Sequence, residues 1–272
     1  MPREVLFVKY YEKGSTDIAA DQMAPALRAR GVPSRSVPAA ELRGVRGAAL
    51  VFVKRADLLD LVRGRLAGCR LVIDVHDTVV FRRGVRWSRL YHGMLFRNRR
   101  ALADFGRGRP TDVVIPHHWD ERYAPHEAPM DRLRLCFLGD PRSTPFEEPL
   151  PGVELVFDGW FARARGFNAH LSIRRPGREA LYKPNLKVAT AAACRAVLVT
   201  TRDESALEHL GPDYPFYTEP DRESVLASIA RAERLFGGPE WERALAILDG
   251  VRERTALPRI TERYLELLAL LG

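Results

Sequence analysis

The sequence has few cysteines and no long apolar run, and these absences exclude several classes of protein. Three cysteines lie far apart in apolar surroundings, at positions 69, 136 and 194. This indicates buried reduced thiols and argues against a disulfide scaffold or a cysteine metal site. No apolar run approaches the ~18 residues that span a bilayer. Charged residues follow the first apolar run directly, so we expect no signal peptide and a cytoplasmic protein.

The net charge of +8 comes from arginines spread along the chain. This excess favours an anionic partner, such as nucleotide phosphates, an acidic lipid surface or nucleic acid, although a GC-rich genome gives the same composition. The sequence has no helix-turn-helix pattern, zinc-finger spacing or aromatic RNA-binding motif. We therefore expect no nucleic-acid partner. Adjacent histidines at 117 and 118 would point opposite ways on an extended chain, so we expect no metal site there.

Apolar runs alternate with amphipathic segments along the chain, which predicts parallel sheets covered by helices on both faces. We predict two Rossmann-like halves, residues 1–124 and 132–272, joined by a proline-marked linker. The predicted strands lie at 4–10, 34–37, 48–54, 70–75, 111–120, 133–138, 153–157, 168–173, 195–200 and 215–217. The predicted helices lie at 17–30, 57–67, 88–105, 185–193, 221–235, 240–252 and 260–271.

The region from Arg82 to Arg109 is rich in arginine and also contains Trp87, Tyr91 and Phe96. A helix over 88–105 would place apolar residues on one side and arginines on another. Such a face is either solvated or in peripheral contact with a membrane or an anionic acceptor.

Residues 182–199 read YKPNLKVATAAACRAVLV, a basic loop that enters an alanine-rich helix and then an apolar strand. Pro184 fits the first turn of a helix, where its missing N–H has no cost. Unpaired backbone N–H groups and the helix dipole favour a bound anion there, close to Lys183 and Lys187. The stretch therefore predicts a phosphate site.

This stretch resembles the nucleotide-sugar-binding signature of GT-B glycosyltransferases, Lys-Pro-x-x-Lys followed by small residues and Gly-x-Pro-Val-Ile. The matching residues are Lys183, Pro184, Lys187, Ala191 and Val199. The glutamate with which many members hold the donor ribose falls on Thr190, the glycine on Arg195 and the proline on Val197.

A second resemblance concerns DVHDT at residues 74–78, which closes a predicted buried strand. Residues at the carboxyl end of a parallel strand face the ligand crevice. His76 and Asp77 match a His-Asp element of retaining GT-B enzymes, in which the histidine reaches the donor sugar or its phosphate. The alternatives are a satisfied loop histidine beside a capping aspartate, or a base that works near neutral pH.

The resemblance also implies donor contacts outside the signature. Gly14 and Gly139 follow predicted strands, and a residue without Cβ lets a ligand approach the backbone. Arg174 is a candidate for clamping the diphosphate, or else a surface arginine. Glu204 is a carboxylate that would serve the ribose if Thr190 does not, or else an exposed glutamate.

Taken together, the resemblance implies an α/β protein with two Rossmann-like domains facing across a cleft. It would move a sugar from a nucleotide-sugar donor to a glycan, lipid-linked or small-molecule acceptor, and the arginines of residues 82–109 favour an anionic one. No Asp-x-Asp motif is present, so we expect neither a metal nor another cofactor. The alternatives are a non-catalytic nucleotide-sugar-binding or assembly subunit, and a GT-B nucleotide-sugar epimerase or hydrolase.

Overall fold

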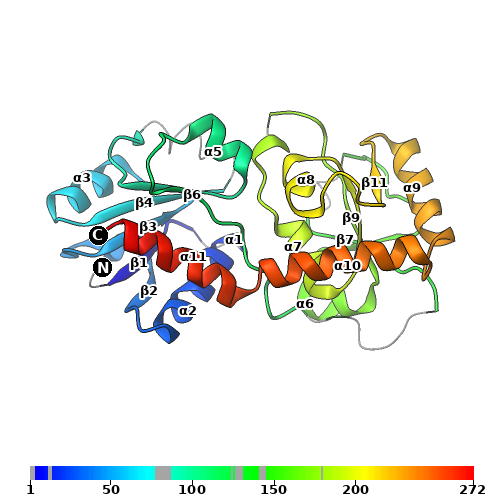
Figure 1. Cartoon of the computed structure of the whole chain (residues 1–272), viewed down its shortest axis with the longest axis horizontal. Helices are drawn as coiled ribbons and strands as arrows, with labels where there is room; N and C mark the ends of the chain where they lie inside the picture. Colours follow the sequence, from blue (N-terminus) through cyan, green and yellow to red (C-terminus); the bar gives the residue numbers. More distant parts are fainter. Residues whose placement is uncertain are drawn as a thin grey trace. The chain divides into compact units, whose positions relative to one another are not determined.

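A computed structural model describes residues 4–11, 14–76, 87–123, 125, 131–140, 145–178 and 180–272, and the chain forms two compact units (Figure 1). The first unit comprises Met1–His118, Tyr182–Pro184 and Ala256–Gly272. The second unit comprises Trp119–Leu181 and Asn185–Thr255. The chain therefore returns twice to the first unit, whereas the ranges predicted from sequence are continuous.

The first unit contains a parallel sheet in the order β2-β1-β3-β4-β5-β6. Every residue of β1 and β3 is buried, as their unbroken apolar runs predict for a sheet covered on both faces. The strands are β1 (Val5–Lys9), β2 (Ser34–Pro38), β3 (Ala49–Val53), β4 (Arg70–Val75), β5 (Gly93–Phe96) and β6 (Asp112–Val114).

Apart from the helix predicted over 88–105, the helices of the first unit lie close to the predicted ranges, and one of them contains an unexpected π-helical stretch. Residues Asp17–Gln22 form π-helical turns just before Pro25. Proline has no N–H to donate to the carbonyl four residues earlier, and π turns accommodate such an interruption. The other elements are α1 (Gly14–Thr16), α2 (Met23–Ala29), a 3-10 turn (Ala39–Leu42), α3 (Leu58–Leu66), α5 (Arg99–Phe105) and α11 (Leu257–Leu270).

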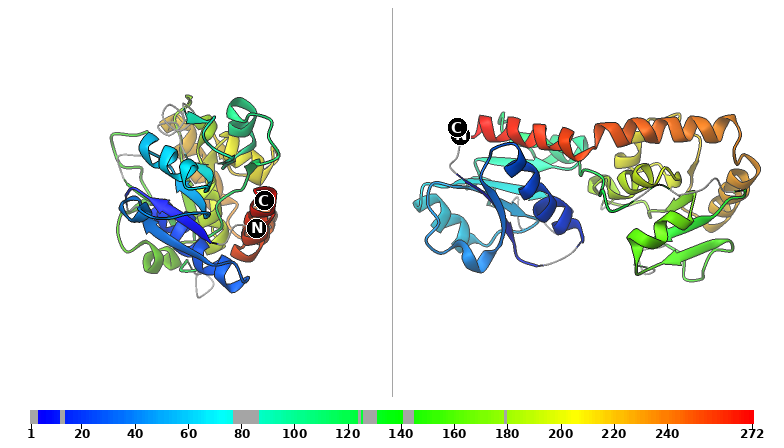
Figure 2. Two further views of the ribbon diagram at one scale, coloured as in Figure 1. Left: turned by 90° about the vertical axis from the view of Figure 1, so that its left-hand side faces the viewer. Right: turned by 90° about the horizontal axis from the view of Figure 1, so that it is seen from below.

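The C-terminal helix α11 belongs to the core of the first unit (Figure 2). Its residues Ile260, Tyr264 and Leu268 are buried in one apolar cluster with Met23 of α2 and Phe7 of β1. The helix therefore completes the hydrophobic cover of the first sheet. Of the described helices, none is long and apolar enough to cross a membrane.

The second unit contains a five-stranded parallel sheet in the order β11-β10-β9-β7-β8. Its alanine-rich helix α7 is mostly buried and packs against α10, as small side chains allow. The strands are β7 (Leu135–Leu138), β8 (Val153–Val156), β9 (Ala169–Ser172), β10 (Val197–Thr201) and β11 (Tyr217–Thr218). The helices are α6 (Trp160–Arg163), α7 (Leu186–Cys194), α8 (Glu204–Leu210), α9 (Arg222–Arg234) and α10 (Pro239–Arg254), with 3-10 turns at Ala164–Gly166 and Ala180–Tyr182.

The helix predicted over 88–105 is wrong. Residues 93–96 form β5 and are buried between β4 and β6, and the shorter α5 begins only after Asn98, whose side chain caps it. The apolar run was too short to distinguish a buried strand from a helical face by periodicity.

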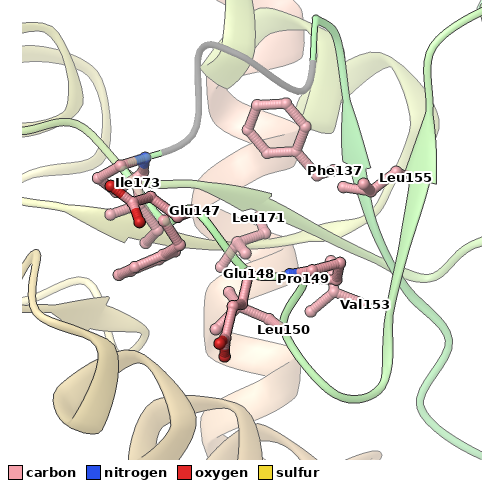
Figure 3. Close-up of a pocket in the computed structure, with 11 residues that line it drawn as sticks. Phe137, Glu147, Glu148, Pro149, Leu150, Val153, Leu155, Leu171 and Ile173 are labelled. Atoms are coloured by element: carbon pink, nitrogen blue, oxygen red, sulfur yellow. The ribbon is translucent and has the colours of Figure 1, made fainter.

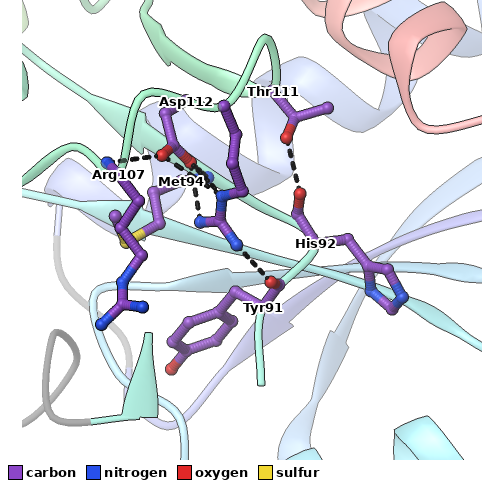
Figure 4. Close-up of polar contacts among 7 residues, drawn as sticks. Tyr91, His92, Met94, Arg107, Thr111 and Asp112 are labelled. Atoms are coloured by element: carbon purple, nitrogen blue, oxygen red, sulfur yellow. Dashed lines mark hydrogen bonds and ion pairs between the residues drawn. The ribbon is translucent and has the colours of Figure 1, made fainter. Parts of the chain in front are cut away.

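Several arginines of this region have structural partners (Figure 4). The carboxylate of Asp112 accepts hydrogen bonds from the Arg109 guanidinium at 2.7 Å and from the backbone N–H groups of Arg107 and Met94. Arg109 also donates to the carbonyl of Tyr91 at 2.6 Å. These contacts join β6 to the segment that enters β5.

Arg195 ends α7 in the left-handed conformation, with φ +50° and ψ 40°. Glycine fits this position because it lacks Cβ, and the signature has glycine here. We expect Arg195→Val to be less stable than Arg195→Gly by about 1–2 kcal/mol, since a β-branched residue is strained at positive φ. Urea unfolding of both variants measures the difference. The Arg195–Asp249 ion pair, with 3.4 Å between its charged groups, is half exposed and contributes little to the stability of the wild type. Equal stability of the two variants would contradict this account.

Candidate functional site

Gly139 and Lys187 meet at the carboxyl edge of the second sheet. Gly139 directly follows β7 with φ +141°, and Lys187 lies in the first turn of α7. A Cβ built on Gly139 would lie 2.9 Å from the Lys187 ammonium. The ammonium donates to the carbonyl of Leu138 and lies 4.9 Å from the centre of the Phe137 ring. The absence of a side chain at 139 therefore leaves room for this charge.

Burial, with a smaller contribution from the nearby Arg174 guanidinium, lowers the pKa of Lys187 to about 8. His170 of β9 is buried, and this burial, with a smaller effect from Lys187, lowers its pKa to about 3. His170 is therefore neutral at pH 7. The described carboxylates form no ion pair with Lys187, so its charge is compensated by a carbonyl dipole and an aromatic face alone.

Arg174 and Glu204 line one cavity of about 230 Å³ in the second unit. The backbone N–H of Arg174 donates to Thr201, and its guanidinium lies 3.3 Å from the carboxylate of Asp203, which also caps α8. The cavity is formed by segments that follow β9, β10 and β11, the end of a parallel sheet at which ligands bind. The lining residues that carry polar side chains are Arg174, Thr201, Arg202, Asp203, Glu204, Thr218 and Glu219.

A second cavity of similar volume lies beside β7 and β8 and differs in chemistry (Figure 3). Phe137, Leu155 and Leu171 contribute apolar walls, and Glu147 and Glu148 supply carboxylates. Carboxylates repel phosphate, and no cation lines the cavity among the described residues. This cavity is therefore a poor candidate for a nucleotide diphosphate.

Lys183 and Thr190 have neighbours that the sequence does not predict. Pro184 precedes the Asn185 cap of α7 instead of occupying its first turn. The segment 182–184 groups with the first unit, where the Asn98 side chain donates to the carbonyl of Lys183 at 3.2 Å. Thr190 lies within α7 and hydrogen-bonds with Tyr123.

In the first unit, a buried ionic cluster closes β4. The carboxylate of Asp74 pairs with the guanidinium of Arg97, and the His76 Nε2 atom lies 2.9 Å from the same carboxylate oxygen. Arg97 also donates to the carbonyl of Ile115 at 2.9 Å and contacts the Tyr264 hydroxyl at 3.3 Å. The cluster therefore ties β4, the segments after β5 and β6, and α11 together.

The electrostatics of this cluster keep His76 neutral. Burial lowers the pKa of His76 to about 4, although Asp74 opposes the shift. Burial alone would raise the pKa of Asp74, but Arg97 and His76 together lower it. Within the described part of the chain, the His76 Nδ1 atom has no hydrogen-bond partner. Asp77 lies outside the described residues.

Lys54 and Arg97 were missed as site candidates. Lys54 follows β3, is buried and has φ +67°, and its ammonium contacts the Ser15 hydroxyl, next to the predicted Gly14. Non-glycine residues rarely adopt this conformation, which concentrates at functional sites. The sequence signal that could have identified Lys54 and Arg97 is a cationic residue directly after an apolar run. Gly14 itself is exposed, with open space around its α-carbon.

The structure resembles solved glycosyltransferases along its whole length. No family model matches the sequence, and no curated protein matches it. A glycosyltransferase from Rickettsia africae ESF-5 superimposes with a TM-score of 0.75 at 10% identity, covering 100% of this chain and 99% of that chain. Anabaena HepE in complex with UDP and glucose has a TM-score of 0.70 at 13% identity, covering 98% and 99%.

A third similar structure, AviGT4, is a glycosyltransferase involved in avilamycin A biosynthesis, with a TM-score of 0.65 at 15% identity and coverage of 99% and 98%. Identities this low show shared architecture and leave the substrate open. The two parallel sheets of six and five strands agree with that architecture. The chain therefore has the two-domain α/β GT-B fold of these glycosyltransferases.

Proposed function

We propose that this protein is a metal-independent glycosyltransferase that moves a sugar from a nucleotide-sugar donor to an acceptor. The observation that carries the proposal is the Lys187–Gly139 pair, which lies close to Arg174 at the carboxyl edge of the second sheet. Solved structures with this fold include HepE with UDP-glucose. A largely desolvated ammonium beside a backbone that carries no side chain suits a diphosphate.

The Lys187 ammonium would bind the donor diphosphate and stabilise the negative charge that develops on it as the glycosidic bond breaks. Arg174, held by Asp203, would supply a second cation. Glu204 and the other carboxylates of the adjoining cavity would accept hydrogen bonds from hydroxyl groups of the ribose. These cations take the role that a bound metal has in other glycosyltransferases. In the described part of the chain, no group of three His, Cys, Asp or Glu residues is arranged to hold a metal ion.

His76 would contact the reacting sugar from the first unit. Its imidazole is neutral and held by Asp74, so it would act as a hydrogen-bonding group and not as a cation. As the resemblance implies, Lys183 would bind the donor diphosphate together with Lys187, and Asp77 would form the His-Asp element with His76.

We expect UDP or a nucleotide sugar to raise the thermal stability of the protein. A ligand that binds only the folded state stabilises it by about 2.7 kcal/mol at a hundredfold excess over Kd. Differential scanning fluorimetry with a panel of nucleotide sugars measures the shift, and EDTA should leave it unchanged. An unchanged melting temperature at saturating concentrations of the whole panel would remove the main support for a donor site.

Lys187→Met should weaken nucleotide binding by about a hundredfold, because it removes the charge and keeps the apolar stem. In the wild type, affinity should fall as pH rises above about 8, because the free lysine then loses the proton that a bound diphosphate requires. The variant should lack this pH dependence. Calorimetry between pH 7 and 9 measures both effects.

Two further variants serve as controls for this experiment. Arg234→Gln removes an exposed charge of the second unit and should bind like the wild type. Lys183→Met makes the same chemical change four residues earlier and shows whether one or both lysines contact the donor. If Lys187→Met binds the nucleotide as tightly as the wild type at every pH, the proposal is wrong.

His76→Ala should lower turnover more than nucleotide affinity, because the proposed partner of His76 is the sugar and not the diphosphate. Removal of a buried ring leaves a cavity, so thermal unfolding should accompany the kinetics. An equal loss of turnover and affinity at unchanged stability would argue against a contact with the sugar.

A further inference from the structure

Helix α3 carries a stripe of apolar side chains that are exposed to solvent. Leu58, Leu59, Val62 and Leu66 are exposed by 40, 57, 39 and 84%. These four residues make up half of the exposed large apolar side chains in the described part of the chain. The stripe is therefore a concentrated surface feature, unlike the single exposed apolar residues that are normal on soluble proteins.

The stripe lies beside the face with which α3 packs on its own sheet. Leu61 and Gly64 are buried, and Gly64 faces Leu50 and Leu71. At about 100° per residue, the four exposed side chains fall within an arc of about 100°. Arg63 and Arg65 follow directly on either side of that arc. The helix therefore presents an apolar strip bordered by cations.

A cationic groove adjoins the same helix. A cavity of about 880 Å³ lies between residues 39–46 and α3. It exists because the crossover from β2 to β3 contains only the short 3-10 turn Ala39–Leu42, where many parallel crossovers have a full helix. The walls combine apolar side chains with the guanidinium groups of Arg43, Arg46 and Arg63.

The three groove arginines are available for a ligand. Arg43, Arg46 and Arg63 are exposed, and none has an ion-pair partner within the described ranges. Asp60 is the carboxylate among the lining residues, and it already accepts a hydrogen bond from the Tyr10 hydroxyl at 2.5 Å. The net charge of the groove is therefore positive.

We propose that α3 and this groove form a docking surface for an anionic lipid bilayer. The leucines would enter the apolar part of the interface, and the arginines would contact phosphate groups of the lipids. A bilayer offers anionic groups next to apolar chains over a broad plane, which complements an apolar strip with cations along its length. The inference goes beyond the proposed function and does not depend on it.

The surface differs from the arginine-rich region over 82–109 that the sequence favoured for membrane contact. In the described part of that region, Arg97 is buried against Asp74, Arg109 binds Asp112, and Arg100 pairs with Asp104 at 2.7 Å. Residues 82–86 lie outside the described residues. These guanidinium groups stabilise the fold. Among the described residues of the first unit, the groove arginines have no ion-pair partner and lie beside exposed leucines.

Co-sedimentation of the full chain with vesicles tests the proposal. We expect binding to phosphatidylcholine vesicles that contain phosphatidylglycerol, weak binding to phosphatidylcholine alone, and a loss of binding as salt is raised. Leu59→Gln combined with Leu66→Gln should lower the partition coefficient by about tenfold, because less apolar surface enters the interface. Arg43→Gln combined with Arg46→Gln should remove the preference for anionic vesicles.

Matched controls come from the second unit. Phe157 has the same exposed fraction as Leu59, 57%, so Phe157→Gln removes comparable apolar surface. Arg234→Gln removes one exposed charge, and both controls should bind vesicles like the wild type. An unchanged melting temperature confirms that each variant is folded.

Three results would overturn the proposal. One is failure of the wild type to bind anionic vesicles. Another is equal loss of binding in Phe157→Gln and the leucine variant. The last is a change of oligomeric state in the leucine variant without a change in vesicle binding, which would assign the stripe to a contact between protein copies.

Discussion

Each unit holds a positive charge near the carboxyl ends of its strands, fully buried at Arg97 and partly buried at Lys187, and the two charges are compensated differently. In the first unit, Arg97 is buried against Asp74 and donates to the carbonyl of Ile115. Removing one partner of such a pair leaves an uncompensated buried charge and is strongly destabilising. The charge of Arg97 is therefore matched within the fold, and the pair holds His76 in place.

In the second unit, the charge of Lys187 is matched less completely. Its ammonium has a carbonyl and an aromatic face as neighbours, and Arg174 lies close enough to lower its pKa. An anionic ligand would offset the cost of burying the Lys187 charge. In the first unit, the carboxylate of Asp74 already neutralises the charge of Arg97. This contrast explains why we assign the donor diphosphate to the second unit.

The strands were predictable from sequence where apolar runs were long and uninterrupted, and their alternation with helices predicted the parallel sheets. The GT-B fold was predicted from the resemblance of residues 182–199 to the family signature. Residues at the carboxyl ends of parallel strands are expected to lie at one edge of the sheet. In agreement with this, Gly139 lies next to Lys187, and Arg174 and Glu204 line one cavity. The residue assignments themselves stay predictions, with Asp77 outside the described residues.

Other features needed three-dimensional information. The short buried strand β5 has no periodicity that separates it from a helical face, which hid Arg97 within a predicted helix. The grouping of Lys183 with the first unit depends on contacts with Asn98, far away in sequence. Lys54 was missed because its place after an apolar run is a weak signal, and nothing in a single sequence marks the left-handed backbone conformation of a lysine.

The central claim is that the charge of Lys187 is compensated by a donor diphosphate, and a crystal structure with bound UDP tests it most directly. We predict a phosphate oxygen within hydrogen-bond distance of the Lys187 ammonium, beside the bare α-carbon of Gly139. UDP bound with its diphosphate elsewhere, and Lys187 still donating to the carbonyl of Leu138, would contradict the account.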